Sequence, residues 1–212
     1  MMLTAEKLTV EMGGATLLHP LSASLNPGTI TAICGPNGAG KSTLLAALAG
    51  LTKPSLGEVL LDGVPLAAMP ARQRARAIGY LPQAGEVAWD VTVRSLVALG
   101  RLPHGDEGAV PVVAALAACD LDRLMERRVS TLSGGEKARA LLARVLAGQP
   151  RWILADEPLA ALDLAHQLAL LATLRRAAAG GAGVVLVLHD LALAMNHADR
   201  VLLLDRGRLV AD

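Results

Sequence analysis

Gly35-Pro36-Asn37-Gly38-Ala39-Gly40-Lys41-Ser42 is an octapeptide of the form GxxxxGK[ST]. It lies between an apolar β-type run at 29–34 and a helical pattern at 42–50, in which Leu44, Leu45 and Leu48 share one face. The glycines of such a loop let backbone N–H groups turn inward to form an anion nest, and the start of the helix adds its partial positive charge. The octapeptide therefore predicts a strand, a phosphate-binding loop and a helix, which make one half of a βαβ unit. The alternative is a glycine-rich turn with a solvated lysine.

The polar side chains at the end of this loop suit the phosphates of a nucleotide. Lys41 would bridge the outer phosphates, and the Ser42 hydroxyl would ligate Mg²⁺. We expect nucleotide contacts along the whole loop and from the residue that follows it: Gly35, Pro36, Asn37, Gly38, Ala39, Gly40, Lys41, Ser42 and Thr43.

A second chemical signal is the run Trp152-Ile153-Leu154-Ala155-Asp156-Glu157, an apolar strand that ends in two carboxylates. Ligands of open α/β sheets bind at the carboxyl ends of the strands, so these carboxylates are expected to face the same crevice as the phosphate loop. Asp156 suits an outer-shell hold on Mg²⁺. Glu157 suits a general base or a water-positioning group, because phosphoryl transfer to water needs an oriented nucleophile. Taken alone, the pair reads as a solvated strand end.

A third motif, Leu132-Ser133-Gly134-Gly135-Glu136, stands directly before a helical pattern. In its structural interpretation it is a helix N-cap, since Ser133 and Glu136 are the residue types that a helix start prefers. In its functional interpretation it is a second phosphate-recognising nest, too far along the chain to be part of the first.

In the rest of the chain, the spacing of apolar residues changes twice between the patterns typical of strands and of helices. β-type runs dominate up to about residue 83, helical patterns follow from about 84 to 131, and strands then alternate with helices, which predicts a mainly parallel α/β sheet covered on both faces. Strands are expected at 8–12, 21–25 (separated from the first by Pro20), 29–34, 58–61, 78–81, 152–155 and 184–188, with a hairpin at 201–210. Helices are expected at 42–50, 93–100, 112–119 (opened by Pro111), 135–147, 162–179 and 191–197.

Composition excludes several classes of protein. The 212 residues fit one domain, or one domain with an inserted subdomain, and the 20 Lys and Arg nearly balance the 19 Asp and Glu, so no basic surplus indicates nucleic acid. The apolar runs are strand-sized, far short of the ~18 to 20 residues that a bilayer span needs. The N-terminus has no signal-peptide pattern, which predicts a cytosolic chain. Cys34 and Cys119 lie in separate apolar segments and are expected to be inert.

The three motifs, in this order, resemble the signature of ABC-type ATPases: residues 35–42, LSGGE at 132–136 and ILADEP at 153–158. LSGG shortly before the acidic pair is more specific to that family than the phosphate loop, which many NTPases share. The resemblance covers essentially the whole chain. It implies a single ABC ATPase domain at 1–212, with an α/β P-loop NTPase core, an N-terminal antiparallel β part and an α-helical subdomain inserted at 84–134. It also implies ATP and Mg²⁺ as ligands and ATP hydrolysis coupled to transport.

The resemblance assigns further positions. Gln83 matches the glutamine loop that joins core to helical subdomain and contacts Mg²⁺ or the attacking water, and His189 matches the switch histidine that contacts the γ-phosphate. Asp163 matches the loop that crosses the dimer interface. Ser133, Gly134 and Gly135 would close over ATP held by a second subunit. The resulting catalytic set is Glu157, His189 and Gln83, and the resulting Mg²⁺ ligands are Ser42, Gln83 and Asp156.

This sequence departs from the family pattern at two places. Most members have an aromatic residue near the end of the first strand that stacks on adenine, whereas the equivalent position here is Met12. A thioether packs on a purine more weakly, so we expect reduced nucleotide affinity and adenine preference. The sequence also ends at Asp212, soon after the predicted hairpin, where relatives usually continue for some tens of residues.

Residues 91–93, 97–104 and 155–167 are similar to those of ATPases that serve importers of siderophore-iron, haem and cobalamin. This likeness implies a homodimer that sandwiches two MgATP on the cytoplasmic face of a membrane, bound to permease subunits and indirectly served by a substrate-binding protein, with no nucleic-acid partner. Gly100 and Arg101 could equally form a helix C-cap. Two other functions stay open: an ATPase of another ABC transporter type, and a soluble ABC ATPase in cofactor or cluster assembly. Co-purification with a multi-span membrane subunit would separate transport from assembly.

Overall fold

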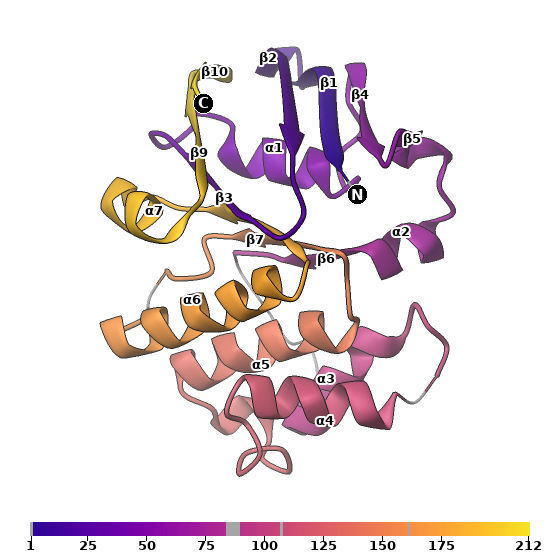
Figure 1. Cartoon of the computed structure of the whole chain (residues 1–212), viewed down its shortest axis with the longest axis vertical. Coiled ribbons are helices and arrows are strands. Elements are labelled where there is room, and N and C mark those ends of the chain that lie inside the picture. Colours follow the sequence, from indigo (N-terminus) through magenta and orange to yellow (C-terminus); the bar gives the residue numbers. More distant parts are fainter. Residues whose placement is uncertain (1, 84–89, 107, 161) are drawn as a thin grey trace.

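The computed structural model describes residues 2–83, 90–106, 108–160 and 162–212. In Figure 1 the strands lie in the upper part of the molecule, and a group of helices lies below them. The predicted start of the helical subdomain at Ala84 lies outside the described residues.

A six-stranded sheet forms the centre of the fold. Its strands are β3 (Ile30–Cys34), β6 (Ile78–Leu81), β7 (Trp152–Asp156), β8 (Gly183–Val187), β9 (Arg200–Asp205) and β10 (Arg208–Ala211). The order is β10-β9-β3-β8-β7-β6, and every neighbouring pair is parallel except β9 and β10, which form the predicted hairpin. Strands β3, β7 and β8 are buried along their whole length, which explains their continuous apolar sequences.

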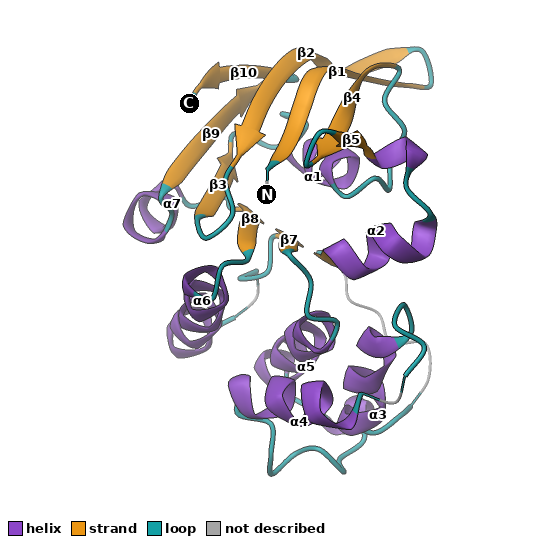
Figure 2. Ribbon diagram, turned by 45° about the vertical axis from the view of Figure 1, so that its right-hand side comes forward, coloured by secondary structure: helices purple, strands orange, loops and turns teal. Residues whose placement is uncertain are grey.

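A second, antiparallel sheet covers one side of the first. It contains β1 (Leu3–Met12), β2 (Ala15–Leu25), β4 (Leu56–Leu61) and β5 (Val64–Pro65), in the order β2-β1-β4-β5. Helix α1 (Lys41–Leu48) contacts strands of both sheets, and its Leu44, Leu45 and Leu48 are buried in the core between them (Figure 2). The prediction of an α/β fold with a mainly parallel sheet and an antiparallel N-terminal part is therefore confirmed.

Two further groups of helices surround the six-stranded sheet. Helices α3 (Val93–Ala98), α4 (Ala109–Ala118) and α5 (Gly134–Ala147) pack on one another, and α6 (Leu164–Ala179) and α7 (Leu191–His197) flank β8 and β3. Short 3-10 helices lie at 66–68, 99–101 and 129–131. Helix α5 starts at the end of the predicted helical subdomain and packs against α3 and α4. The division of the chain at 84–134 stays a prediction.

The predicted strand break at Pro20 is wrong, because β2 runs through this residue from Ala15 to Leu25. Strand β2 lies at the edge of its sheet, and Pro20 is exposed there. Proline removes one backbone donor, which an edge strand tolerates because only one of its sides is paired.

Two helices differ from the expectation. Pro111 does not open α4, which already begins at Ala109, but it lies within the first turn, where backbone N–H groups have no partner inside the helix. Helix α2 (Ala71–Ala77), with the sequence ARQRARA, was not predicted. Only Ala77 of α2 is buried, so the segment carries too little apolar periodicity to mark a helix.

The two cysteines lie in buried apolar segments, as expected from the sequence. Cys34 and Cys119 are buried and free, and burial raises the pKa of the Cys119 thiol to about 12. Within the described ranges, no helix combines the length and the apolarity needed to cross a membrane.

Candidate functional site

The phosphate loop joins β3 to α1 and has the backbone conformation for which its glycines are needed. Gly35 has φ 147° and Gly40 has φ 94°, both outside the range that other residues adopt readily. A Cβ atom on Gly35 would lie 2.1 Å from the backbone oxygen of Leu204 in β9, and one on Gly40 would lie 2.7 Å from Cδ2 of Leu18 in β2. The loop is therefore held closely against strands of both sheets.

The turn between β9 and β10 adds backbone hydrogen bonds to this support. The N–H of Gly207 donates to the carbonyl of Ala39 at 3.0 Å, and the carbonyl of Gly207 accepts the N–H of His19 in β2 at 2.8 Å. One residue near the end of the chain thus links the phosphate loop to β2.

Lys41 and Ser42 begin α1 and point to different parts of the site. The Lys41 side chain is buried, and its Nζ donates to the carbonyl oxygens of Gly35 (2.9 Å) and Pro36 (3.0 Å). The Ser42 hydroxyl donates to Oδ1 of Asp156 at 3.0 Å. The ammonium group is therefore held at the loop, and the hydroxyl is held at the first of the two predicted carboxylates.

The position of Asp156 and Glu157 follows from the parallel topology of the sheet. Strands β3, β8 and β7 are neighbours and run in the same direction, so the carboxyl end of β7 lies at the same sheet edge as the phosphate loop. Asp156 is only 5% exposed, and this burial raises the pKa of its carboxyl group, against the opposing effect of the Ser42 hydrogen bond. A buried carboxyl group with a raised pKa beside the phosphate loop is a candidate functional group.

We predict that Asp156→Asn stabilises the chain in the absence of ligand. The amide keeps the shape and can still accept the Ser42 hydrogen bond, but it removes a charge that burial disfavours. The expected rise in melting temperature is about 2–4 °C at neutral pH, or about 1 kcal/mol. Because the folded-state pKa of Asp156 is raised, the wild type loses this disadvantage relative to the variant as pH falls and Asp156 takes up its proton. Thermal unfolding of both proteins across pH should show that the difference between their melting temperatures becomes smaller towards acid. A difference that grows towards acid would contradict a raised pKa of Asp156.

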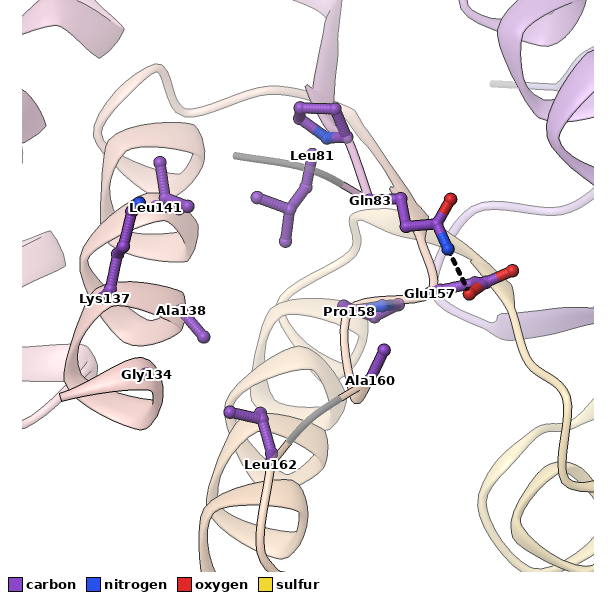
Figure 3. Close-up of a pocket in the computed structure, with 11 residues that line it drawn as sticks. Leu81, Gln83, Gly134, Lys137, Ala138, Leu141, Glu157, Pro158, Ala160 and Leu162 are labelled. Carbon is purple, nitrogen blue, oxygen red and sulfur yellow. Dashed lines mark hydrogen bonds between the residues drawn. The ribbon is translucent and has the colours of Figure 1, made fainter. Parts of the chain in front are cut away.

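The Glu157 carboxylate contacts the other two predicted catalytic residues, Gln83 and His189. Oε2 of Glu157 accepts a 2.6 Å hydrogen bond from Nε2 of Gln83, which follows β6 (Figure 3), and Oε1 is paired with Nε2 of His189, which follows β8. The backbone of Glu157 has φ 48°, a left-handed conformation that costs energy in a residue other than glycine. The chain thus turns sharply after Asp156 and presents its second carboxylate towards β6 and β8. The structure brings Gln83, Glu157 and His189 together; their catalytic roles stay predictions.

The structure places Ser133, Gly134, Gly135 and Asp163 at two other helix starts. Ser133 caps α5 by a complete capping box with Glu136, which confirms the structural interpretation of that motif. Asp163 caps α6. Gly134 lines a cavity whose opposite side includes Gln83 and Glu157 (Figure 3). The predicted contact with a second subunit's nucleotide stays a prediction.

Met12 lies at the exposed end of β1, beside the hairpin that leads into β2. Its side chain is 61% exposed, and it pairs with Ala15 across the turn. Further along β2, Leu17 and Leu18 lie close to Gly40 of the phosphate loop. Met12 therefore belongs to a hairpin that borders the phosphate loop, and its contact with a base stays a prediction.

Two polar residues beside the site were not singled out from the sequence. Asp190 caps α7 by accepting the N–H groups of Ala192 and Leu193, which fixes the chain directly after His189. The sequence pattern that could have indicated this N-cap is an Asp directly before a helical pattern. His166 contacts both Asp163 and the LSGGE segment, and no local sequence pattern indicates that contact.

The family model described as ABC transporter matches residues 18–160. The chain is 44% identical to "Hemin import ATP-binding protein HmuV" of Myxococcus xanthus over 99% of this chain and 83% of the relative. It is 47% identical to the protein of the same name from Nocardia farcinica, over 99% of this chain and 76% of the relative. Among solved structures, the dimeric post-hydrolysis state of an ATP-binding cassette bound to ADP and Pi matches with a TM-score of 0.86 and 28% identity, covering 99% of this chain and 97% of that one.

Proposed function

The chain belongs to the ABC transporter family as an ATP-binding subunit, a transporter ATPase, and from that premise we propose that it powers the import of haem through a membrane permease. The observation that carries the choice of cargo is the sequence identity of 44% and 47% to two haemin import ATP-binding proteins, which extends over 99% of this chain. Haem itself would be recognised by the permease and a binding protein, which are other chains.

We assign the phosphates of ATP to the loop at 35–42 and Mg²⁺ to Ser42 and Asp156. The 3.0 Å contact between the two side chains provides a hydroxyl and a carboxylate oxygen, which are donors that Mg²⁺ prefers. Such a partial shell suits Mg²⁺, which is usually held by one or two protein groups together with phosphate oxygens. Bound there, Mg²⁺ would neutralise charge on the phosphates.

We assign hydrolysis to Glu157, with Gln83 and His189 beside it. Glu157 would orient the attacking water and take up its proton, because a carboxylate within hydrogen-bond reach of the water can act as a general base. The hydrogen bond from Gln83 and the contact with His189 hold both oxygens of this carboxylate. Since the resemblance assigns Gln83 to Mg²⁺ or the attacking water and His189 to the γ-phosphate, one cluster would hold the base and sense the nucleotide.

The functional unit would be a pair of chains on a permease at the cytoplasmic face of the membrane. Ser133 and Gly134 are exposed at the start of α5, and Asp163 is exposed at the start of α6. Exposed N–H groups at a helix start attract phosphate. We therefore propose that these segments face the ATP of a second copy, and that closure of the pair moves the permease.

The test is co-purification followed by transport. The tagged chain is isolated from membranes of its native cells, and the permease that comes with it is reconstituted in vesicles. We expect ATP-dependent uptake of haem with the wild type and none with Glu157→Gln. Haem, cobalamin and a ferric siderophore are supplied in parallel, so that uptake of another chelate would replace haem as the cargo. Recovery without any multi-span subunit would instead support an assembly ATPase and refute the transport role.

Met12→Tyr should tighten ATP binding by about 3- to 10-fold. An aromatic ring at the exposed end of β1 can stack on adenine, and such stacking is worth about 1–3 kcal/mol per base, part of which a thioether already provides. Titration with ATP and with GTP would measure the affinity and the preference between bases. Val64→Tyr, at an exposed position of β5, is the control and should leave both unchanged. An unchanged or weaker affinity for ATP in Met12→Tyr would remove Met12 from the base site.

A further inference from the structure

His166 lies in the first turn of α6 and makes two hydrogen bonds to one carboxylate oxygen. Oδ1 of Asp163 accepts the backbone N–H of His166 at 2.9 Å and lies 2.7 Å from its ring Nδ1. These bonds lower the pKa of Asp163, the backbone bond most strongly, so the carboxylate is ionised and can only accept. Nδ1 therefore carries the proton and donates it. The orientation of the imidazole ring is fixed by Asp163.

The same ring packs on Gly135 of the LSGGE segment. A Cβ atom built on Gly135 would lie 2.7, 2.8 and 2.9 Å from Cδ2, Cγ and Nε2 of His166, which are the three nearest atoms. Gly135 lies within α5 in an ordinary helical conformation. Its backbone therefore does not require glycine; the imidazole ring takes the space of a side chain. The ring lies between the starts of α5 and α6.

Gln167, the next residue, braces the segment that precedes α6. Its Nε2 donates to the carbonyl oxygens of Leu159 (3.2 Å) and Leu162 (3.1 Å). The first turn of α6 thus holds Leu159 and Leu162, and His166 connects the same turn to α5.

We propose that His166 is a positioning residue that fixes Asp163, at the start of α6, relative to the LSGGE segment. The inference rests on the proposed function, in which both segments meet the second copy of the chain. They come from different helices, and nothing in the local sequence sets their spacing. The imidazole sets it, because one edge of the ring is bonded to Asp163 and the ring packs on Gly135. A site assembled from two chains needs this spacing, since a shift of about 1 Å away from the chemistry can cost about 100-fold in rate.

The functional test uses three substitutions of His166. His166→Asn keeps a donor close to the position of Nδ1, His166→Phe keeps a ring against Gly135, and His166→Ala removes both. For His166→Ala we expect a kcat at least 10-fold lower and, in a Glu157→Gln background, a dimer at least 10-fold weaker with MgATP. The affinity of the single subunit for a fluorescent ATP analogue should change less than 2-fold. Asn and Phe should each restore part of the loss.

A double-mutant cycle tests the contact itself without nucleotide. Gly135→Ala should lower the melting temperature because its new Cβ meets the His166 ring. In the Gly135→Ala/His166→Ala protein the ring is absent, so the loss caused by the first substitution should be smaller. Additive effects would show that the ring and Gly135 do not interact, and would overturn the inference.

Failure of this inference can be distinguished from failure of the proposed function. If the wild type hydrolyses ATP and His166→Ala matches it in kcat and dimer strength, His166 has no positioning role and the function stands. If the wild type neither hydrolyses ATP nor dimerises, both fail. His197→Ala, at the last residue of α7, is the matched control and should behave as wild type.

Discussion

Glu157→Gln is expected to bind MgATP and hydrolyse it about 10²- to 10⁴-fold more slowly than the wild type, the range over which a positioned general base accelerates proton transfer. The amide has nearly the size of the carboxylate and can still accept the hydrogen bond from Gln83, so the fold around it should persist. It cannot take a proton from water at neutral pH. ATP should therefore remain intact between two subunits, and the variant should accumulate as an ATP-bound dimer.

Single-turnover hydrolysis and sedimentation in the presence of MgATP measure these two effects. Glu126→Gln is a suitable control, because Glu126 is an exposed carboxylate paired with Arg94. It should hydrolyse ATP as the wild type does and should not trap a dimer. Wild-type turnover in Glu157→Gln would eliminate Glu157 as the base.

Gly35→Ala is expected to cause the largest loss of stability among substitutions in the phosphate loop. The added Cβ would lie 2.1 Å from the backbone oxygen of Leu204, and a strand backbone in the middle of the core cannot move aside as a flexible side chain can. Together with the φ of 147°, this should cost about 3 kcal/mol or more, which corresponds to a drop in melting temperature of about 10 °C.

Gly38→Ala in the same loop separates packing from backbone strain. Gly38 also has a positive φ, of 76°, but a Cβ there would meet nothing within 4 Å. Only the conformational penalty of about 1–2 kcal/mol remains. Thermal unfolding without nucleotide should rank the proteins as wild type, Gly38→Ala and Gly35→Ala, in order of falling stability. Equal losses would mean that β9 does not press on the loop.

The sequence predicts best the parts whose cause is local. The limits of β6 and α7 agree with the expected 78–81 and 191–197, because each is bounded by a clear change of period or a turn residue. The pairing of Ser42 with Asp156 follows from one further rule, that parallel strands place their carboxyl ends at one edge. Topology thus connects two motifs that are far apart in the chain.

Other features depend on packing that no local pattern contains. Strand β2 continues through Pro20 because it is an edge strand, which only the order of the sheet reveals. The left-handed backbone of Glu157 is set by its surroundings rather than by a glycine. The contact of His166 with Gly135 joins the starts of two helices, and it can be recognised only when both helices are placed.

The ribosome releases residues 35–42 long before it releases Leu204 and Gly207. Until then the loop lacks the strand backbone on which Gly35 rests, and Ala39 lacks the N–H of Gly207. Because domains generally fold as units during synthesis, the phosphate loop is completed only when β9 and the turn after it have emerged. A nascent chain that already carries the whole octapeptide therefore still lacks the contacts that support the phosphate loop in the folded structure.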